Sequence, residues 1–168
     1  ETTTLVLVTR PESSSLAEAA RTSRELANLG VKNQQLIMNG VFVSSAPSDP
    51  VARALEARGQ EALAVIPEEI AGLDRTTVPL QAGGLLGLAA LRTLGTRAEA
   101  PVAIASAKDF QDEVASGLQG LVDEFAAAER GVVLVMGKGG VGKTTVASAL
   151  AVALADRGHP VRLSTTDP

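Results

Sequence analysis

Cysteine is absent from the sequence and aromatic residues are scarce, with three Phe, no Trp and no Tyr among 168 residues. Without cysteine, these residues can form neither a disulfide nor a thiolate metal site. The scarcity of aromatic side chains argues against nucleic-acid modules that stack bases on aromatic platforms. A single His argues equally against a His-rich metal site and a His-based catalytic triad.

A basic surface is also lacking, because the net charge is −4. Such a charge gives no overall footprint for nucleic acid or an anionic membrane, so we expect no nucleic-acid partner. No apolar run reaches the roughly 18 residues that would span a bilayer, and the first residues lack the basic head and apolar run of a secretory signal. The chain starts without Met in a strand-like segment and stops within a motif. We therefore expect it to be a piece of a longer protein.

The composition is otherwise that of a globular protein, with 45% hydrophobic and 20% charged residues. Short apolar runs alternate with longer segments of helical spacing, which predicts an α/β fold with a mostly parallel sheet and flanking helices. The predicted strands are residues 5–8, 36–38, 76–80, 132–136 and 161–164. The predicted helices are residues 16–29, 51–63, 85–94, 109–130 and 143–156, of which 85–94 is expected to be buried.

Changes in composition divide the chain into three parts. Residues 1–95 contain the first strand and helix units, and residues 131–168 open a new strand–loop–helix unit. Between them, residues 96–130 begin with an Ala-rich linker and continue as a helix that we expect to dock on its own domain. The apolar face of that helix consists of Phe110, Val114, Leu118, Leu121, Val122 and Phe125.

A glycine-rich loop joins the strand and the helix of the last unit, and it fits the pattern G-x-x-x-x-G-K-[ST] without a mismatch. Glycines allow positive φ, so that successive N–H groups point at phosphate oxygens, and the following helix adds the positive end of its dipole. Lys143 is expected to reach the β- and γ-phosphates, the Thr144 hydroxyl to bind Mg²⁺ and Thr145 to donate to the α-phosphate. The alternative, a glycine-rich turn with a coincidental lysine, is disfavoured because pattern and context agree. The loop consists of Gly137, Lys138, Gly139, Gly140, Val141, Gly142, Lys143 and Thr144.

Asp167 is a further candidate, because it follows the predicted strand at residues 161–164. Open α/β sheets place ligand-binding groups at the carboxyl ends of their strands. A carboxylate there could hold a Mg²⁺-bound water or orient an attacking water. From its position alone, Asp167 could equally be a loop aspartate that is solvated and binds no ligand.

The loop holds a second lysine, Lys138, directly after its first glycine, and so resembles the deviant phosphate loop of the MinD/ParA and arsenite-ATPase class. In that class the extra lysine reaches across a dimer interface to the other subunit's nucleotide. Residues 163–168 resemble the S-T-D-P stretch of arsenite-pump ATPases and tail-anchored-protein targeting ATPases, with one additional Thr. The resemblance implies that Asp167 serves the Mg²⁺ and water site.

Residues 1–95 resemble the late portion of one ATPase half in the same class, where a strand-end Asn and a Pro-Leu loop enclose adenine. The matching positions are Asn39, Pro79 and Leu80. An Asn amide can donate to and accept from an adenine edge. Without the resemblance, Asn39 and Gly40 would be interpreted as a turn pair.

The order of these portions resembles an arsenite-pump ATPase of two pseudo-symmetric P-loop NTPase halves. It implies that residues 1–95 end the first half, residues 96–130 link the halves and residues 131–168 begin the second, so that both halves are incomplete. Asn39 and Pro79 would then serve the first half's nucleotide, while Lys143, Thr144 and Asp167 serve the second's. Lys138 would reach towards the first half's nucleotide.

The family implies hydrolysis of ATP with Mg²⁺ to drive extrusion of arsenite or antimonite. It also implies a membrane carrier, ArsB, a metallochaperone as a further partner, and a cytoplasmic position at the inner face of the membrane. The family's cysteine thiolates, its acidic D-T-A-P-T-G-H-T switch and the first half's phosphate loop are missing from these residues, so we expect no hydrolysis by this piece alone. A tail-anchored-protein targeting ATPase and an inactive nucleotide-binding module are the alternatives.

Overall fold

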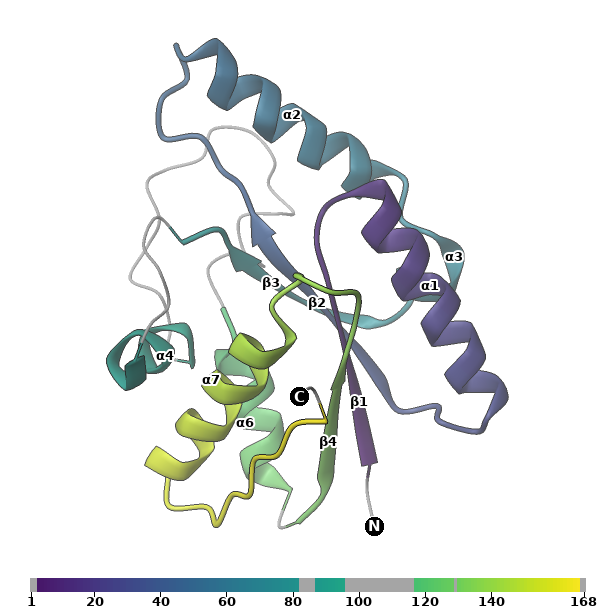
Figure 1. Ribbon diagram of the computed structural model, residues 1–168, viewed down its shortest axis with the longest axis vertical. Helices are drawn as coiled ribbons and strands as arrows, with labels where there is room; N and C mark the ends of the chain where they lie inside the picture. Colours follow the sequence, from purple (N-terminus) through teal and green to yellow (C-terminus); the bar gives the residue numbers. More distant parts are fainter. Residues whose placement is uncertain (1–2, 82–86, 96–116, 129, 167–168) are drawn as a thin grey trace.

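A parallel four-stranded sheet forms the centre of the computed structural model, which describes residues 3–81, 87–95, 117–128 and 130–166 (Figure 1). The strand order is β3-β2-β1-β4, and each neighbouring pair is parallel. The prediction of an α/β fold with a parallel sheet is therefore confirmed. The strands are β1 (Thr3–Thr9), β2 (Gln34–Val41), β3 (Asp74–Pro79) and β4 (Val132–Met136).

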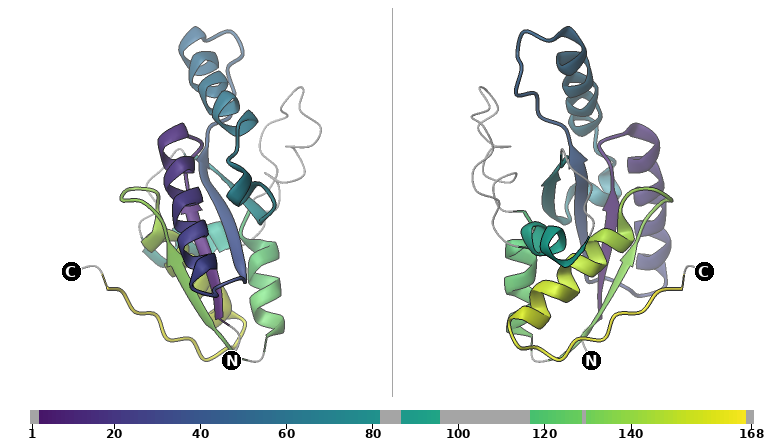
Figure 2. Two further views of the ribbon diagram at one scale, coloured as in Figure 1. Left: turned by 90° about the vertical axis from the view of Figure 1, so that its right-hand side faces the viewer. Right: turned by 60° about the vertical axis from the view of Figure 1, so that its left-hand side comes forward.

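Helices cover both faces of this sheet, and Figure 2 shows α1 and α6 on opposite sides of it. The helices α1, α2 and α3 pack with one face, and α4, α6 and α7 pack with the other. The helices are α1 (Ser13–Asn28), α2 (Pro50–Ala64), α3 (Glu68–Ala71), α4 (Gly87–Gly95), α6 (Gln119–Ala127) and α7 (Lys143–Asp156).

The central strand β1 supplies both layers of the core, because successive side chains of a strand point to opposite faces. Leu5 and Leu7 pack with α1, whereas Val6 and Val8 pack with the layer that contains α7. All four side chains are at most 1% exposed. This burial on two faces explains why the strand is a continuous apolar run rather than an alternating one.

The strand β4 pairs with β1 in register, so that Leu134 lies beside Leu5. Residues after 130 thus share one sheet with residues before 95. The pairing leaves β4 at the edge of the described sheet, where Val132 and Leu134 are 46% and 44% exposed.

Two predicted elements differ from the structure. The helix α4, which was expected to be buried, is mostly exposed. Only Leu94 and Gly95 at its end are fully buried, and Leu91 is partly buried against the same core. Residues 161–164 are extended but form no strand, and Val161 and Leu163 are 41% and 54% exposed. An alternating apolar pattern describes side chains only, whereas a strand also needs a neighbouring backbone to bond with.

The helix predicted at residues 109–130 is confirmed in its described portion. Leu118, Leu121 and Val122 are buried and Phe125 is partly buried, all in the layer that contains α7. Docking on its own domain is therefore confirmed for this portion. Phe110 and Val114 lie outside the described residues.

Candidate nucleotide site

The carboxyl ends of four parallel strands meet at one edge of the sheet, the upper edge in Figure 1. There β4 leads into the glycine-rich loop, β1 is followed by Arg10, β2 ends at Val41, two residues after Asn39, and β3 ends at Pro79. This edge is where open α/β sheets bind ligands. The topology therefore brings sequence-predicted site residues from distant parts of the chain to one place.

The loop from Gly137 to Gly142 takes a backbone path that depends on glycine. Gly137, Gly140 and Gly142 have φ values of 153°, 79° and 96°. These positive angles are strained for any residue with a side chain. The loop ends where α7 begins, with Gly142 as the residue that precedes the helix.

Val141 anchors the middle of the loop in the protein core. Its side chain is 1% exposed and packs in the same cluster as Val8 and Val146. The loop is thus not a free surface turn, because a buried aliphatic side chain fixes its position. This packing favours a preformed cradle over a coincidental glycine-rich turn.

Lys143 lies across the loop that precedes it. Its Nζ donates a hydrogen bond to the Lys138 carbonyl oxygen at 3.4 Å, and the residue is half-buried. Backbone amides in the first turn of a helix have no partner within the helix, so amides at the start of α7 are available beside this ammonium. Together they form a site that fits a phosphate group.

The two threonines after Lys143 occupy the first turn of α7, Thr144 exposed and Thr145 half-buried. An exposed hydroxyl at the end of a phosphate cradle is a suitable oxygen donor for Mg²⁺. Asp167, the second predicted magnesium residue, lies outside the described residues and stays a prediction. Among the described residues, no group of three or more His, Cys, Asp or Glu side chains could hold a metal ion.

Asn39 is in direct contact with the loop. Its Nδ2 donates a hydrogen bond to the Val141 carbonyl oxygen at 2.8 Å, and a Cβ on Gly142 would overlap the same Nδ2 atom. The sequence assigned Asn39 and the loop to different nucleotides, whereas the structure brings them together. Asn39 and Gly40 lie within β2, so the alternative that they form a turn pair is wrong. The positive φ of 75° at Gly40 accompanies an irregularity in the pairing of β2 with β3.

Pro79 and Leu80 lie further along the same edge, beside β2. The backbone N–H of Leu80 donates to the Val41 carbonyl oxygen at 2.8 Å, which continues the pairing of β3 with β2. The Leu80 side chain is 52% exposed. An exposed leucine at the carboxyl edge can pack against a flat apolar ring.

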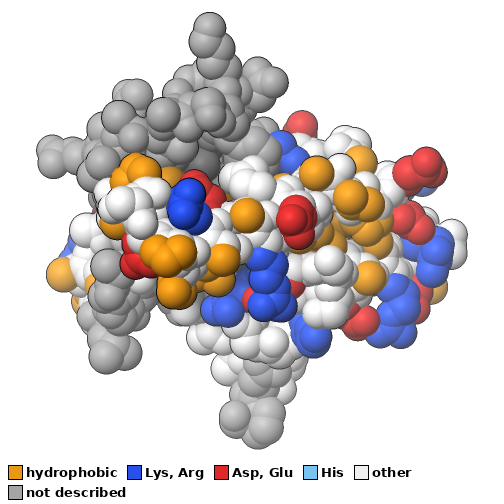
Figure 3. Space-filling model, turned by 90° about the horizontal axis from the view of Figure 1, so that it is seen from above, with side chains coloured by type: hydrophobic (Ala, Val, Ile, Leu, Met, Phe, Trp, Pro, Cys, Tyr) orange, Lys and Arg blue, Asp and Glu red, His pale blue; other side chains and the backbone are white. Residues whose placement is uncertain are grey.

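Positive charge gathers at this edge although the chain is acidic overall. Arg10, Lys138 and Lys143 all follow strands that end here, and Lys and Arg side chains gather on the surface that Figure 3 shows from above. A local concentration of cations attracts a polyanion even where the net charge is negative.

The charge of Lys138 acts on a carboxyl group of α1, which sequence reasoning did not foresee. A hydrogen bond from Arg21 at 2.5 Å is the main cause that lowers the pKa of the Glu18 carboxyl, and the charge of Lys138 lowers that pKa further. A lysine can act on a carboxylate in this way only when the two lie near each other. No spacing rule could have linked these residues, because they are brought together by the pairing of β4 with β1.

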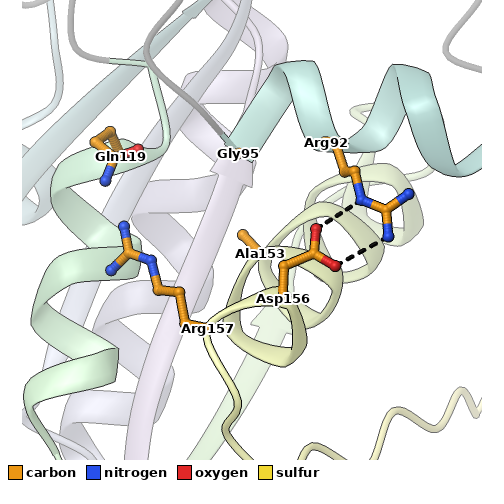
Figure 4. A pocket seen from close by; sticks show the side chains of 6 residues that line it. All are labelled: Arg92, Gly95, Gln119, Ala153, Asp156 and Arg157. Carbon is orange, nitrogen blue, oxygen red and sulfur yellow. Dashed lines mark hydrogen bonds and ion pairs between the residues drawn. The ribbon is translucent and has the colours of Figure 1, made fainter.

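A hollow lies between α4, α6 and α7, away from the loop (Figure 4). Arg92 binds both carboxylate oxygens of Asp156, at 2.6 and 2.9 Å, and Arg157 pairs with Asp123 at 2.7 Å. The hydrogen bond from Arg92 lowers the pKa of Asp156, and that from Arg157 lowers the pKa of Asp123. These pairs connect α7 to α4 and to α6, and we interpret them as structural.

A glycine-rich phosphate loop between a parallel strand and a helix defines the class of P-loop NTPases. Within that class, the chain belongs to the anion-transporting ATPase family, whose family model matches residues 1–98 and 130–168. The residues between these matches lie within the predicted linker.

Curated relatives agree with this assignment. The chain is 48% identical to an arsenical pump-driving ATPase of Escherichia coli and 46% identical to one of Acidiphilium multivorum, over 99% and 100% of its length. It is 34% identical to a putative arsenical pump-driving ATPase of Halobacterium salinarum, over 99% of its length. The chain spans less than a third of each relative, 29%, 29% and 28% respectively. No helix among the described residues is both long enough and apolar enough to cross a membrane.

Proposed function

We propose that this chain is part of an ATP-hydrolysing motor subunit that drives extrusion of arsenite or antimonite. The observation that carries the proposal is the phosphate cradle, in which a buried Val141 and three glycines of positive φ hold the loop at the start of α7. The relatives named as arsenical pump-driving ATPases support the choice of cargo.

The proposed site uses the loop amides and Lys143 to bind the β- and γ-phosphates, which are the groups that gain charge during phosphoryl transfer. Thr144 would hold Mg²⁺, which neutralises charge on the phosphate oxygens, and Thr145 would bind the α-phosphate. Asp167 would hold a Mg²⁺-bound water. Asn39, Pro79 and Leu80 would border the adenine of the nucleotide that the first half binds.

The arrangement in the longer protein is also part of the proposal. Residues 1–95 would end one ATPase half, residues 96–130 would link the halves and residues 131–168 would begin the other. Lys138 would stabilise the nucleotide of the neighbouring half. The partners would be the membrane carrier ArsB and a metallochaperone, with the motor at the cytoplasmic face of the membrane.

The test is calorimetric titration of the chain with MgATP, beside ATP hydrolysis by the full-length protein with and without antimonite. We expect Lys143→Ala to weaken MgATP binding at least tenfold, because it removes the cation that faces the phosphates. Lys32→Ala is the matched control, since Lys32 is exposed and precedes β2 at the opposite edge of the sheet. Unchanged MgATP binding and unchanged ATP turnover in Lys143→Ala would refute the proposal that this loop belongs to an ATP-hydrolysing motor.

Antimonite distinguishes the proposed pump motor from a targeting ATPase. A motor coupled to metalloid extrusion should hydrolyse ATP faster when its cargo is bound, because the cargo must favour the competent state. Hydrolysis that is indifferent to antimonite and arsenite, in a protein that still needs Lys143, would favour the targeting ATPase instead.

A further inference from the structure

The strand β2 carries one residue more than the strand with which it pairs. Asn39 lies beside Val78 and Val41 lies beside Pro79, so Gly40 is an extra residue between two paired positions. Such a β-bulge is rare between parallel strands, and bulges are typical of places where a strand re-aims a side chain next to a site.

We propose that Gly40 is a positioning residue for the base of the nucleotide that the first half binds, because its bulge places Asn39 and Leu80 beside each other. This inference rests on the proposed function, which assigns Asn39 and Leu80 to that base. It adds the backbone feature that determines how strongly the site prefers adenine. The contacts of the bulge lie within residues 1–95, which the proposed function places in the first half alone.

The bulge changes which face of the sheet the end of β2 presents. Successive side chains of a strand point to opposite faces, so Met38 and Val41, three positions apart, would ordinarily lie in opposite layers. Both are instead buried in the layer that contains α1, at 0% and 3% exposure. Asn39 follows Met38 directly and therefore lies on the other face. The extra residue thus keeps Val41 in the core while Asn39 lies on the opposite face, near the carboxyl edge.

Leu80 adjoins the bulge through both its backbone and its side chain. The Leu80 N–H donates to the carbonyl oxygen of Val41, the residue directly after the bulge, at 2.8 Å. A Cβ on Gly40 would lie 3.7 Å from Leu80 Cδ1, so the leucine side chain lies against the bulge itself. Asn39 and Leu80 thus both adjoin Gly40. An amide beside an exposed leucine can bind the polar edge and the apolar face of a flat ring.

The backbone conformation of Gly40, rather than the space around it, is what requires glycine. Its φ of 75° lies in the left-handed region, which Asn adopts more readily than most residues and which a β-branched residue hardly adopts. The distance of 3.7 Å to Leu80 is an ordinary contact, so a side chain at position 40 has room. Gly40→Asn and Gly40→Val therefore form a matched pair, in which Asn keeps the bulge and Val removes it.

The experiment uses the full-length protein with Lys143→Ala, which disables the phosphate loop of the second half and leaves the first half as the tighter nucleotide site. Calorimetric titrations with MgATP, MgGTP and magnesium tripolyphosphate then measure how far binding depends on the base. We expect Gly40→Val to weaken MgATP binding about tenfold and to reduce the preference for ATP over GTP, because the contacts with the base are displaced. Affinity for tripolyphosphate, which has no base, should change much less. Gly40→Asn should retain most of the affinity for ATP and most of the preference.

Two results of these titrations are distinct failures. If the Lys143→Ala protein binds none of the three ligands, the first half has no nucleotide site and that part of the proposed function fails. If it binds MgATP but Gly40→Val changes all three affinities equally or changes none, the inference is wrong and the proposed site stands. The inference is also wrong if Gly40→Asn loses the preference as fully as Gly40→Val does.

Leu80→Ala tests the same arrangement without altering the backbone, in case Gly40→Val does not fold. In the same Lys143→Ala protein it should weaken MgATP binding more than tripolyphosphate binding, because the lost contact is with the base. Leu29→Ala is the matched control, since Leu29 is 79% exposed and follows α1 at the opposite edge of the sheet. An unchanged MgATP affinity in Leu80→Ala would overturn the inference.

Discussion

The carbonyl oxygen of Val8, in the central strand, occupies the space that a Cβ on Gly137 would need. The first glycine of the loop is therefore required by the neighbouring strand as well as by its own φ of 153°. The start of the phosphate loop and the end of β1 are packed as one unit.

Gly137→Ala should therefore destabilise the protein by about 1–3 kcal/mol, because the added methyl must displace a backbone. We expect a lower midpoint of thermal unfolding and weaker MgATP binding. Gly139→Ala is the control within the same loop, since a Cβ on Gly139 meets no atom within 4 Å. Equal destabilisation by the two substitutions would mean that the packing against Val8 is not what requires the glycine.

The sequence predicted the strand, loop and helix of residues 132–156 well, because each depends on local pattern. The apolar run is followed by glycines that permit positive φ, and α7 starts directly after them. The pairing of β4 with β1 was not predicted. Periodicity shows which side chains seek burial, but it does not show which backbone lies beside a strand.

The same limit explains what was missed at the site. Asn39 and Lys138 were both chosen from resemblance, but neither the hydrogen bond of Asn39 to Val141 nor the influence of Lys138 on Glu18 follows from spacing. Exposure of α4 was also missed. Its apolar composition resembles that of a buried helix, yet Leu88 is 58% exposed.

The ion pair between Arg92 and Asp156 should make stability depend on pH in the acidic range. The hydrogen bond from Arg92 lowers the pKa of Asp156 from its ordinary value of 3.8, so the folded state favours the ionised carboxylate. Such a group stabilises the fold above its unfolded pKa and loses that contribution as pH falls through its folded pKa.

We therefore expect the difference in unfolding midpoint between the unsubstituted protein and Asp156→Asn to be largest near neutral pH and to shrink below about pH 4. The pair is exposed, so the difference should be small and should decrease in 1 M salt. Arg92→Gln should reproduce the same loss of pH dependence. A difference that grows on acidification would contradict the pairing.

The docking of α6 depends on Leu118, which is fully buried beside the layer that contains α7. Leu118→Ala should lower the free energy of unfolding by about 2–5 kcal/mol, because it removes buried apolar surface and leaves a cavity. Leu88→Ala applies the same chemical change at a leucine that is 58% exposed. It should lower the free energy of unfolding far less than Leu118→Ala does. Chemical denaturation measures both, and equal effects would mean that α6 is not docked in solution.

Lys138 should affect catalysis more than binding, in contrast to Lys143. The Nζ of Lys143 lies over its own loop, bonded to the Lys138 carbonyl, whereas the Lys138 side chain is exposed. If Lys138 acts on a neighbouring nucleotide, Lys138→Ala should lower ATP turnover by the full-length protein about a hundredfold, as expected for loss of a charge that stabilises the transition state. MgATP affinity of the chain, measured by calorimetry, should change much less.

Lys138→Arg is the comparison that keeps the charge and should retain part of the turnover. A loss of affinity in Lys138→Ala as large as that in Lys143→Ala would instead assign both lysines to one phosphate cradle.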